Sequence, residues 1–346
     1  MIGKIPPEVM ARLVYTRLGF ADSDVLVGPA TGEDAAIIDI GDGKALVVHS
    51  DAITGASESL GWLAVNIVAN DIAVRGVKPR WFLMSLFLPE NSSENLLSTI
   101  MRQVDEAARD LKIMVVGGHT EVTSGLDRPI AGTTAIGIAD KKKIVTTSGA
   151  KTGDYVIMTK TTAIEGTAIL CTDFASLLKD RGVDRYTIEK GSKFLAKISV
   201  VKEALALAEN RIATAMHDPT EGGILGGVAE LAYASRRTIE LWVDKVPIAR
   251  ETEIATEALK INALKLISSG ALIATVPLDK LNESFEVLQK IGVEASVIGR
   301  VKDYAGHLVE IVRGSLIEYV DDVYVADELF RLWRGKQKSR LIDYYG

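Results

Sequence analysis

The sequence is poor in cysteine, the residue with which small secreted proteins stabilise their folds. It contains one cysteine, Cys171, among 346 residues. A single cysteine excludes an internal disulfide and any multi-cysteine zinc site within one chain. Because Cys171 falls in an apolar helical stretch, we expect it to be a buried packing residue.

Long apolar runs and an excess of positive charge are also missing. No run approaches the roughly 18 apolar residues that span a bilayer, and the first residues, MIGKIPPEVM, lack the apolar stretch of a signal peptide. We therefore expect a cytoplasmic protein with no membrane partner. The net charge of −6 argues against a nucleic-acid partner bound through phosphate attraction.

Length and composition favour an ordered protein of two domains. Hydrophobic residues make up 47% of the chain and charged residues 25%, which are ordinary values for globular proteins. A prior of roughly 150 residues per domain gives two domains. The polar stretch 140–153 marks the boundary, so we predict domains at 1–150 and 151–330 and a basic tail at 331–346.

Apolar, β-branched runs alternate with helical patterns along the chain, which predicts an α/β protein. The predicted strands cover 35–40, 44–50, 80–88, 112–116, 129–139 and 155–159, and the predicted helices cover 58–74, 94–110, 165–174 and 192–210.

The first two acidic motifs, GEDAA at 32–36 and HSDA at 49–52, flank a predicted β-hairpin with a strong turn signal at 41–43. If the turn has two central residues, Asp34 faces Asp51 at roughly 5 Å, and their repulsion needs a cation. Magnesium fits, because it takes oxygen ligands and is shared between carboxylates and nucleotide phosphates. A three-residue loop would shift the register by one and leave both carboxylates solvated. The sequence leaves both interpretations open.

The third motif, NIVAND at 66–71, lies in an apolar predicted helix. Buried amides more often satisfy local hydrogen bonds than bind ligands, so Asn66 is interpreted as structural. Asp71 is different, because a charge in so apolar a helix is rarely buried unless it is paired or coordinated. Asp71 is therefore a candidate ligand.

The fourth motif, GGHTE at 117–121, follows a short predicted strand. Two glycines after a strand allow close approach of the backbone to a ligand, although glycine pairs are also ordinary turn formers. His119 is a candidate for orienting a phosphate, although a lone histidine is more often structural.

The fifth motif, HDPTEGG at 217–223, predicts a helix start. Asp218 would be the N-cap, Pro219 the first helical residue and Glu221 the partner of a capping box. Such a helix start presents amide groups to an anion. The four glycines between 222 and 227 indicate close approach of either a neighbouring backbone or a phosphate.

Taken together and in this order, five segments carry a resemblance to the superfamily of aminoimidazole ribonucleotide synthetase: GEDAA, HSDA, LAVNIVANDIAVRGVKP, GGHTE and HDPTEGGILGGVAELA. Within it the chain most resembles the HypE-type hydrogenase maturation factors, which use ATP to dehydrate a carboxamide to a nitrile. The resemblance covers roughly residues 25–330. It implies an N-terminal sheet that forms a dimeric barrel with a second subunit, an α/β C-terminal domain, and ATP with magnesium in the cleft between the domains.

The resemblance also implies the roles of individual residues. Asp34, Asp51 and Asp71 match metal ligands, and Glu121 would substitute for the acidic residue that relatives often carry in place of His119. The candidate catalytic residues are Asp51, Asp71 and His119. The implied ATP contacts are Gly32, Glu33, Asp34, Asn70, Gly117, Gly118, Thr120, Lys160, Asp218, Thr220, Gly222 and Gly223.

Departures from the family limit the transfer of function. The maturation factors carry their substrate on a C-terminal cysteine, whereas this chain ends LIDYYG. We therefore expect a Mg-ATP-dependent enzyme that activates an amide or similar oxygen of an unknown small-molecule or carboxamide substrate, with a protein partner in metalloenzyme maturation. Two alternatives stay open: a thiamine-monophosphate kinase-like phosphotransferase, and a non-catalytic ATP-binding regulatory or assembly protein.

Overall fold

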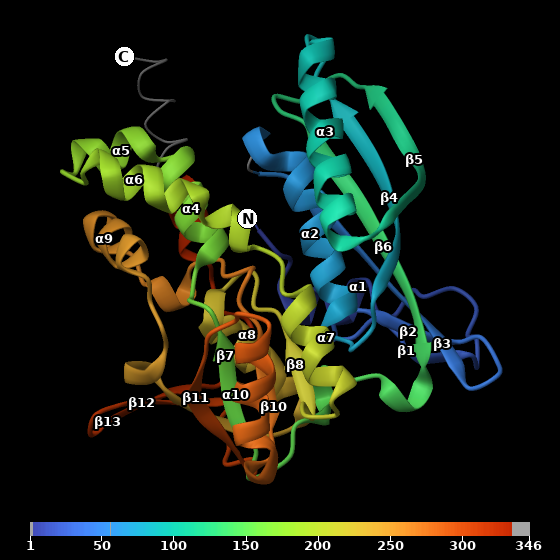
Figure 1. Ribbon diagram of the computed structural model, residues 1–346, viewed down its shortest axis with the longest axis vertical. Helices are drawn as coiled ribbons and strands as arrows, with labels where there is room; N and C mark the ends of the chain where they lie inside the picture. The colour runs from blue at the N-terminus through green and yellow to red at the C-terminus, as the bar shows by residue number, and fades with distance from the viewer. Residues whose placement is uncertain (1–2, 56, 334–346) are drawn as a thin grey trace.

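The computed structural model describes residues 3–55 and 57–333, which form two mixed sheets and the helices packed on them (Figure 1). The N-terminal sheet has the strand order β1-β2-β3-β6-β4-β5. Its strands are β1 Val25–Val27, β2 Ala36–Asp39, β3 Lys44–Ile53, β4 Pro79–Leu88, β5 Met114–Val122 and β6 Ile130–Asp140. The helices of this half are α1 Pro7–Leu13, α2 Leu60–Ala73 and α3 Glu94–Leu111.

The C-terminal sheet has the strand order β13-β12-β9-β11-β7-β10-β8. Its strands are β7 Tyr155–Thr159, β8 Ala215–His217, β9 Thr238–Trp242, β10 Ile273–Val276, β11 Ala295–Lys302, β12 Val309–Arg313 and β13 Leu316–Val320. The helices of this half are α4 Ile164–Thr172, α5 Ala175–Asp180, α6 Arg185–Gly191, α7 Val201–Glu209, α8 Gly223–Ser235, α9 Arg250–Leu259 and α10 Leu281–Lys290. The predicted two-domain α/β fold is confirmed.

Patterning explains the layers of the N-terminal half. Buried and half-buried residues alternate along β4 and β6, as expected for strands with one face on the core. Helix α2 is buried almost throughout because it lies between the sheet, α3 and α7. Helix α3 is amphipathic and starts at Ser93, whose hydroxyl accepts a hydrogen bond from the Leu96 amide at 3.2 Å.

The main hydrophobic core continues across the two halves of the chain. One cluster includes Val68 of α2, Leu207 of α7 and Leu272 next to β10. The polar residues of α2 are therefore held in a fixed position relative to both sheets, and this arrangement places the candidate site.

The hairpin between β2 and β3 has the three-residue loop, residues 41–43, and its strand register follows from that loop length. Ala36 pairs with Val48 and Asp39 with Ala45, and the amide of Ile40 donates to the Lys44 carbonyl at 3.2 Å. Residues 41–43 all have positive φ, a conformation that two glycines and one aspartate can adopt. This pairing excludes the two-residue turn. Asp34 precedes β2, so it does not face Asp51 across a strand pair.

Two other predicted elements need correction. The helix predicted at 192–210 is broken into a 3₁₀ segment, Ser192–Lys197, and helix α7. GGHTE is not a loop after a strand but the second half of β5. A Cβ on Gly118 would lie 2.0 Å from the Met84 carbonyl oxygen, so glycine here permits close pairing of β5 with β4.

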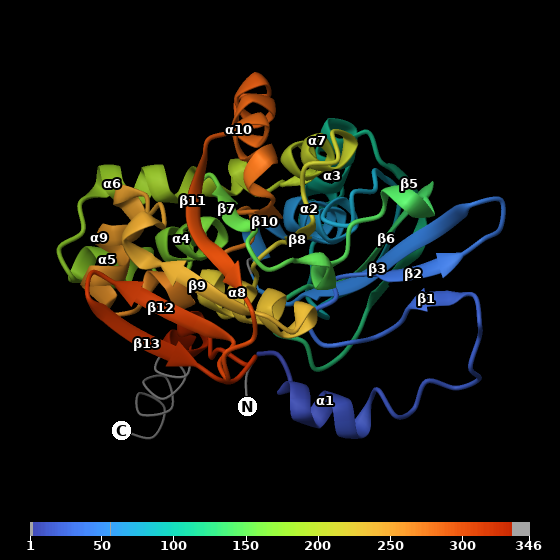
Figure 2. The same cartoon turned by 90° about the horizontal axis from the view of Figure 1, so that it is seen from below.

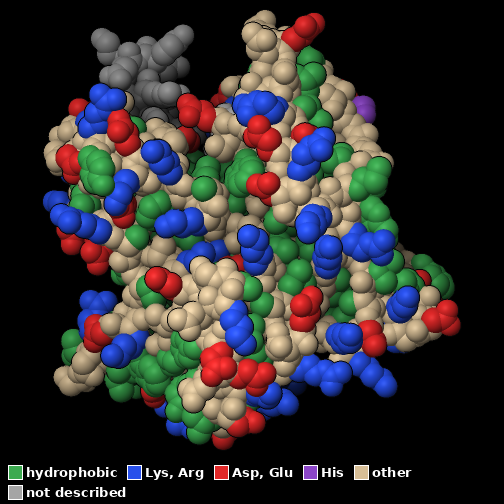
Figure 3. All heavy atoms as spheres, in the orientation of Figure 1, with side chains coloured by type: hydrophobic (Ala, Val, Ile, Leu, Met, Phe, Trp, Pro, Cys, Tyr) green, Lys and Arg blue, Asp and Glu red, His purple; other side chains and the backbone are tan. Residues whose placement is uncertain are grey.

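The surface carries both charges and some exposed apolar residues. Lysine and arginine side chains are spread over the face in Figure 3, with acidic side chains between them. Leu316, Ile317 and Tyr319 of β13 are exposed. Figure 2 shows α1 lying outside both sheets. None of the described helices combines the length and apolarity needed to cross a membrane. The predicted basic tail lies outside the described residues from position 334 onward.

Candidate functional site

Three aspartates from distant parts of the chain meet between the two sheets. Asp34 precedes β2, Asp71 lies in the last turn of α2, and Asp218 follows β8. One carboxylate oxygen of each lies within 4.8 Å of the other two. The predicted packing residue Cys171 is not part of this cluster; it is buried in α4, as expected. The carboxylate oxygens of the aspartates are hard ligands of the kind that magnesium binds.

The electrostatics of this cluster favour a bound cation. Both carboxylate oxygens of Asp218 and Oδ2 of Asp71 are buried without a hydrogen-bond partner among the described residues. Burial, and then the neighbouring carboxylates, raises the pKa of Asp71 and of Asp218 well above the usual range. Unpaired buried carboxylates are costly unless they are protonated or coordinated. The donor set and its orphaned oxygens fit magnesium.

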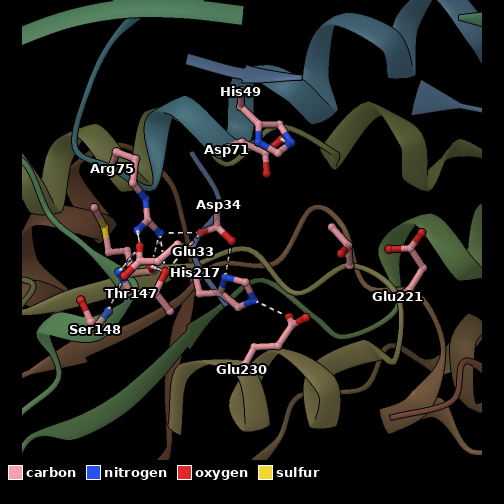
Figure 4. A network of polar contacts seen from close by, with 12 residues as sticks. Glu33, Asp34, His49, Asp71, Arg75, Thr147, Ser148, His217, Glu221 and Glu230 are labelled. Atoms are coloured by element: carbon pink, nitrogen blue, oxygen red, sulfur yellow. Dashed lines mark hydrogen bonds and ion pairs between the residues drawn. The ribbon is translucent and has the colours of Figure 1, made fainter. Parts of the chain in front are cut away.

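Asp34 differs from the other two because two buried cations hold it. The Arg75 guanidinium contacts Asp34 Oδ2 at 2.5 Å, and His217 Nδ1 contacts Oδ1 at 2.7 Å (Figure 4). Burial would raise the pKa of Asp34, but His217 and Arg75 lower it overall. Asp34 is thus kept ionised beside two carboxyls that resist ionisation.

His217 is itself held between two carboxylates. Its Nε2 lies 2.9 Å from Glu230 Oε2 on α8, on the side opposite Asp34. Burial would lower the pKa of His217, but Asp34 and Glu230 together raise it well above its usual value. The imidazole therefore carries a proton and fixes the orientation of Asp34.

Arg75 ties the first acidic motif to both halves of the chain. It is fully buried and also donates to Glu33 Oε2 at 2.7 Å, to Thr147 Oγ1 at 2.6 Å and to the Met216 carbonyl at 2.9 Å. Glu33 in turn accepts hydrogen bonds from the amides of Thr147 and Ser148. Glu33, predicted to contact ATP, thus has a structural role.

A cavity of about 360 Å³ opens beside the cluster and is partly covered by the N-terminal segment. Asp34, Asp71 and Asp218 line it, together with Lys4. The Lys4 ammonium lies 3.1 Å from Thr220 Oγ1 and 3.3 Å from Glu221 Oε2. Desolvation opposes its charge, but Glu221, Glu230 and Asp51 raise the pKa of Lys4, so the amine is protonated.

Asp51, Thr220 and Gly32, which the sequence made candidate site residues, also line this cavity. Asp51 is exposed on β3, and its Oδ1 accepts from the Ala52 amide at 2.7 Å. It lies on the same strand face as His49, whose Nε2 is 3.5 Å from Asp71 Oδ2. Asp51 therefore faces the site without belonging to the three-aspartate cluster.

Two predicted ATP contacts, Asn70 and Lys160, have hydrogen-bond partners within the chain. Asn70 donates to the Ile198 carbonyl at 3.0 Å and accepts from the Val200 amide at 2.9 Å. Lys160 donates to the carbonyls of Lys197 and Ser199 and pairs with Glu203 at 2.7 Å. Their side chains join the start of α7 to α2 and β7. Asn66 donates to the Trp62 carbonyl, in line with its structural interpretation.

The GGHTE residues lie away from the cluster within one chain. β5 is an edge strand, and Gly117, Gly118, His119, Thr120 and Glu121 are all exposed. His119 is in register with Ser85, Gly132 and Ala52 across three strand spacings, roughly 14 Å from the backbone beside Asp51. His119 pairs with Glu121 at 2.9 Å. Within one chain, these side chains therefore do not reach the three-aspartate cluster.

The helix start predicted at Asp218 is wrong. Helix α8 begins at Gly223, and Gly222 before it has φ +82° and donates its amide to Asp327 Oδ2 at 2.8 Å. A Cβ on Gly223 would lie 2.5 Å from the Leu264 carbonyl oxygen. Neighbouring backbone thus explains these glycines, and Asp218 is released from capping to join the acidic cluster.

Sequence reasoning missed Arg75, His217, Glu230 and Lys4. Arg75 could have been found, because the argument that a charge in an apolar helix needs a partner applies equally one turn after Asp71. His217 is the first residue of the HDPTEGG motif, but no role was predicted for it. For Glu230 and Lys4 the sequence carries no comparable signal, since exposed acidic and basic residues are common in helices and terminal segments.

The site and the two sheets define an AIR synthase-related protein. Residues 32–139 match the N-terminal domain of the AIR synthase related proteins, and residues 151–311 match their C-terminal domain. The chain belongs to this superfamily.

Similar proteins of known sequence fall into two groups. A protein assigned to hydrogenase expression and formation in Methanocaldococcus jannaschii is 29% identical over 91% of this chain and 93% of its own. The carbamoyl dehydratase HypE of Cupriavidus necator is 25% identical over 81% of this chain and 80% of its own. The selenide, water dikinase of Sulfurovum sp. is 26% identical over 89% and 95%. The chain is thus similar to maturation proteins and to a dikinase.

Solved structures share the fold. A chain in the crystal structure of a HypE–HypF complex has a TM-score of 0.74 at 22% identity, covering 90% of this chain and 99% of that one. HypE in complex with ATP has a TM-score of 0.69 at 19% identity, and the match covers 91% of this chain and 93% of that one. ThiL complexed with AMPPCP and TMP has a TM-score of 0.70 at 19% identity, and the match covers 92% of this chain and 99% of that one.

Proposed function

We propose that this chain is a magnesium- and ATP-dependent enzyme that transfers the γ-phosphoryl group of ATP to an amide or similar oxygen of a small-molecule substrate and releases ADP. The observation that carries this proposal is the meeting of Asp34, Asp71 and Asp218 with buried, unpartnered oxygens. Similar folds bind ATP or AMPPCP in HypE and ThiL, which supports nucleotide binding here.

The proposed roles follow from position and charge. Asp34, Asp71 and Asp218 would hold magnesium, with Asp51 beside them, and the metal would neutralise phosphate charge. Lys4 is the protonated amine that reaches into the same cavity, so it would contact a phosphoryl oxygen. Arg75 and His217 hold Asp34 in place. Phosphoryl transfer depends mainly on such positioning and electrostatics.

The first test is isothermal titration with ATP, with and without magnesium, beside an assay of ADP release over a panel of amides and thiamine monophosphate. Magnesium-dependent binding with turnover supports the enzyme, and the active panel member separates the maturation-like branch from the kinase-like branch. Tight binding without turnover favours a regulatory protein. Absence of binding overturns the site.

Asp51→Asn tests the proposed metal ligation at the edge of the cluster. We expect the variant to fold and to lose turnover, because the exposed Asp51 supports no described core contact. Thermal melting checks the fold, and ADP release checks the activity. Retained turnover would remove Asp51 from the metal site.

We also propose that two chains pair through β5. This edge strand exposes Met114, Val115, Val116 and Val122 with its backbone edge unpaired by any described strand. Long exposed apolar edges are normally covered, and a second copy would cover β5 while bringing GGHTE to another site. The HypE–HypF neighbour further supports the proposal of a protein partner in maturation.

A further inference from the structure

A second, smaller pocket lies beside the proposed phosphate site. Its volume is about 80 Å³, and Asp51 and Thr220 stand at its border with the larger cavity. Apolar walls come from Ile67 of α2, Ile169 of α4 and Trp333. The space exceeds that of a single water molecule and suits the end of a small ligand.

Two buried polar side chains line this pocket. Glu165 of α4 is 7% exposed, and no ion pair to it occurs within residues 3–55 and 57–333. Ser269 is 1% exposed, and its hydroxyl lies beside the Glu165 carboxyl, whose pKa it lowers through a hydrogen bond. Buried polar groups of this kind are normally satisfied by a partner or a ligand.

The charge around the pocket selects the kind of ligand. Burial raises the pKa of Glu165 to about 7; the Ser269 hydroxyl opposes this rise, and Glu221 and Asp327 add to it. Burial likewise raises the pKa of Asp327 to about 7. The described groups facing Glu165 are thus acidic, and Lys4, the nearby base, is paired with Glu221. Such surroundings repel an anion, accept a neutral group and attract a cation.

We propose that this pocket binds a primary ammonium group of the substrate, with Glu165 as its counter-ion and Ser269 as an additional hydrogen-bond acceptor. The alkyl stem of the ligand packs on the apolar walls. This inference rests on the proposed function, because it makes the pocket the acceptor subsite: a ligand anchored at Glu165 extends past Thr220 and Asp51 toward the acidic cluster. The acceptor class is therefore an amine-bearing small molecule.

The test compares three probes with the same carbon chain: butylammonium, butyramide and butyrate. Saturation-transfer NMR detects millimolar binding of each to the full chain at pH 8. We expect contact with butylammonium and none with butyrate. Glu165→Gln removes the charge with little change of shape and should weaken butylammonium binding at least about tenfold. Glu253→Gln, an exposed carboxylate on α9 outside the pocket, is the matched control and should bind as the parent does.

The outcomes separate this inference from the proposed function. Equal binding of butyramide and butylammonium, or unchanged binding by Glu165→Gln, overturns the ammonium site. Titration with Mg-ATP on the same samples tests the phosphate site independently, so its failure removes the enzyme proposal whatever the amine does. Amine binding lost in Glu165→Gln, with Mg-ATP binding intact, supports both.

Discussion

At the scale of single residues, the site combines buried charges that have partners with buried charges that lack them. Arg75 and His217 neutralise Asp34, and Glu230 balances His217. Within the described part of the chain, Asp218 has no hydrogen-bond partner, and Asp71 has only His49, at 3.5 Å from its Oδ2. Such a group destabilises the fold unless it gains a proton or a cation. A site that costs stability in the absence of its ligand indicates a binding function.

Replacing Asp71 with asparagine should therefore separate stability from binding. Asp71→Asn removes a carboxyl whose ionisation is opposed by burial and by Asp51 and Asp34, so the free energy of unfolding at pH 8 should rise. Magnesium-dependent ATP affinity should fall at least about tenfold. Urea denaturation and calorimetric titration measure the two effects. Asp180→Asn, at the exposed end of α5, should change neither.

Glu165 predicts a second dependence of stability on pH. Its pKa of about 7 in the fold, against an ordinary 4.5, means that the folded chain binds this proton more tightly than the unfolded chain. The stability that Glu165 contributes is therefore present below pH 4.5 and is lost as pH rises toward 7. Relative to Glu165→Gln, the parent should lose about 2–3 kcal/mol between pH 4.5 and pH 8. Urea titrations across this range that run parallel for the two chains would contradict the assignment.

At the scale of elements, the start of α8 is set by close approach of backbone rather than by capping. Gly222 and Gly223 both have positive φ, and the carbonyls of Leu264 and Leu266 occupy the space where a Cβ on Gly223 would lie. Asp218 lies in the segment before this packing, beside Asp34 and Asp71.

Alanine substitutions can separate the cost of a positive φ from the cost of a steric clash with neighbouring backbone. Gly43→Ala in the hairpin loop meets open space at φ +72° and should cost about 1 kcal/mol from φ alone. Gly223→Ala has a similar φ, +65°, and would also place a Cβ 2.5 Å from a carbonyl oxygen. We expect it to cost at least about 1 kcal/mol more. Equal losses in chemical denaturation would show that the backbone yields at α8.

Several elements and the acidic residues could be predicted from the sequence because their signals are local. Apolar and β-branched runs predicted β4 and β6, and the apolar helix with one aspartate made Asp71 a candidate ligand. The hairpin register could not be chosen, since Gly41-Asp42-Gly43 suits both loop lengths. The start of α8 was wrong because the contact that fixes it lies with Leu264, some forty residues later in the chain. The charge balance at His217 likewise depends on Glu230 and Asp34, which only tertiary structure brings together.

At the scale of the whole molecule, α2 connects the parts of the site. Asn70 binds the segment before α7, and Arg75 binds the Met216 carbonyl on β8, so both halves of the chain fix the positions of Asp71 and Asp34. One element remains outside this arrangement: β5 carries His119 on an exposed edge. The roughly 14 Å between His119 and the Asp51 backbone position is too far for a shared phosphate within one chain.

Mixing two defective chains tests whether a second copy completes the site. Asp71→Asn and His119→Ala should each bind Mg-ATP weakly. If each site takes Asp71 from one chain and His119 from the other, a mixed dimer holds one intact site and one doubly altered site. Random pairing makes half of the dimers mixed, so about a quarter of all sites should regain tight binding. Calorimetric stoichiometry measures this fraction, and native mass spectrometry verifies that mixed dimers have formed. Mixed dimers without tight sites would place His119 outside the site, and tight binding by His119→Ala alone would make the edge strand a contact surface only.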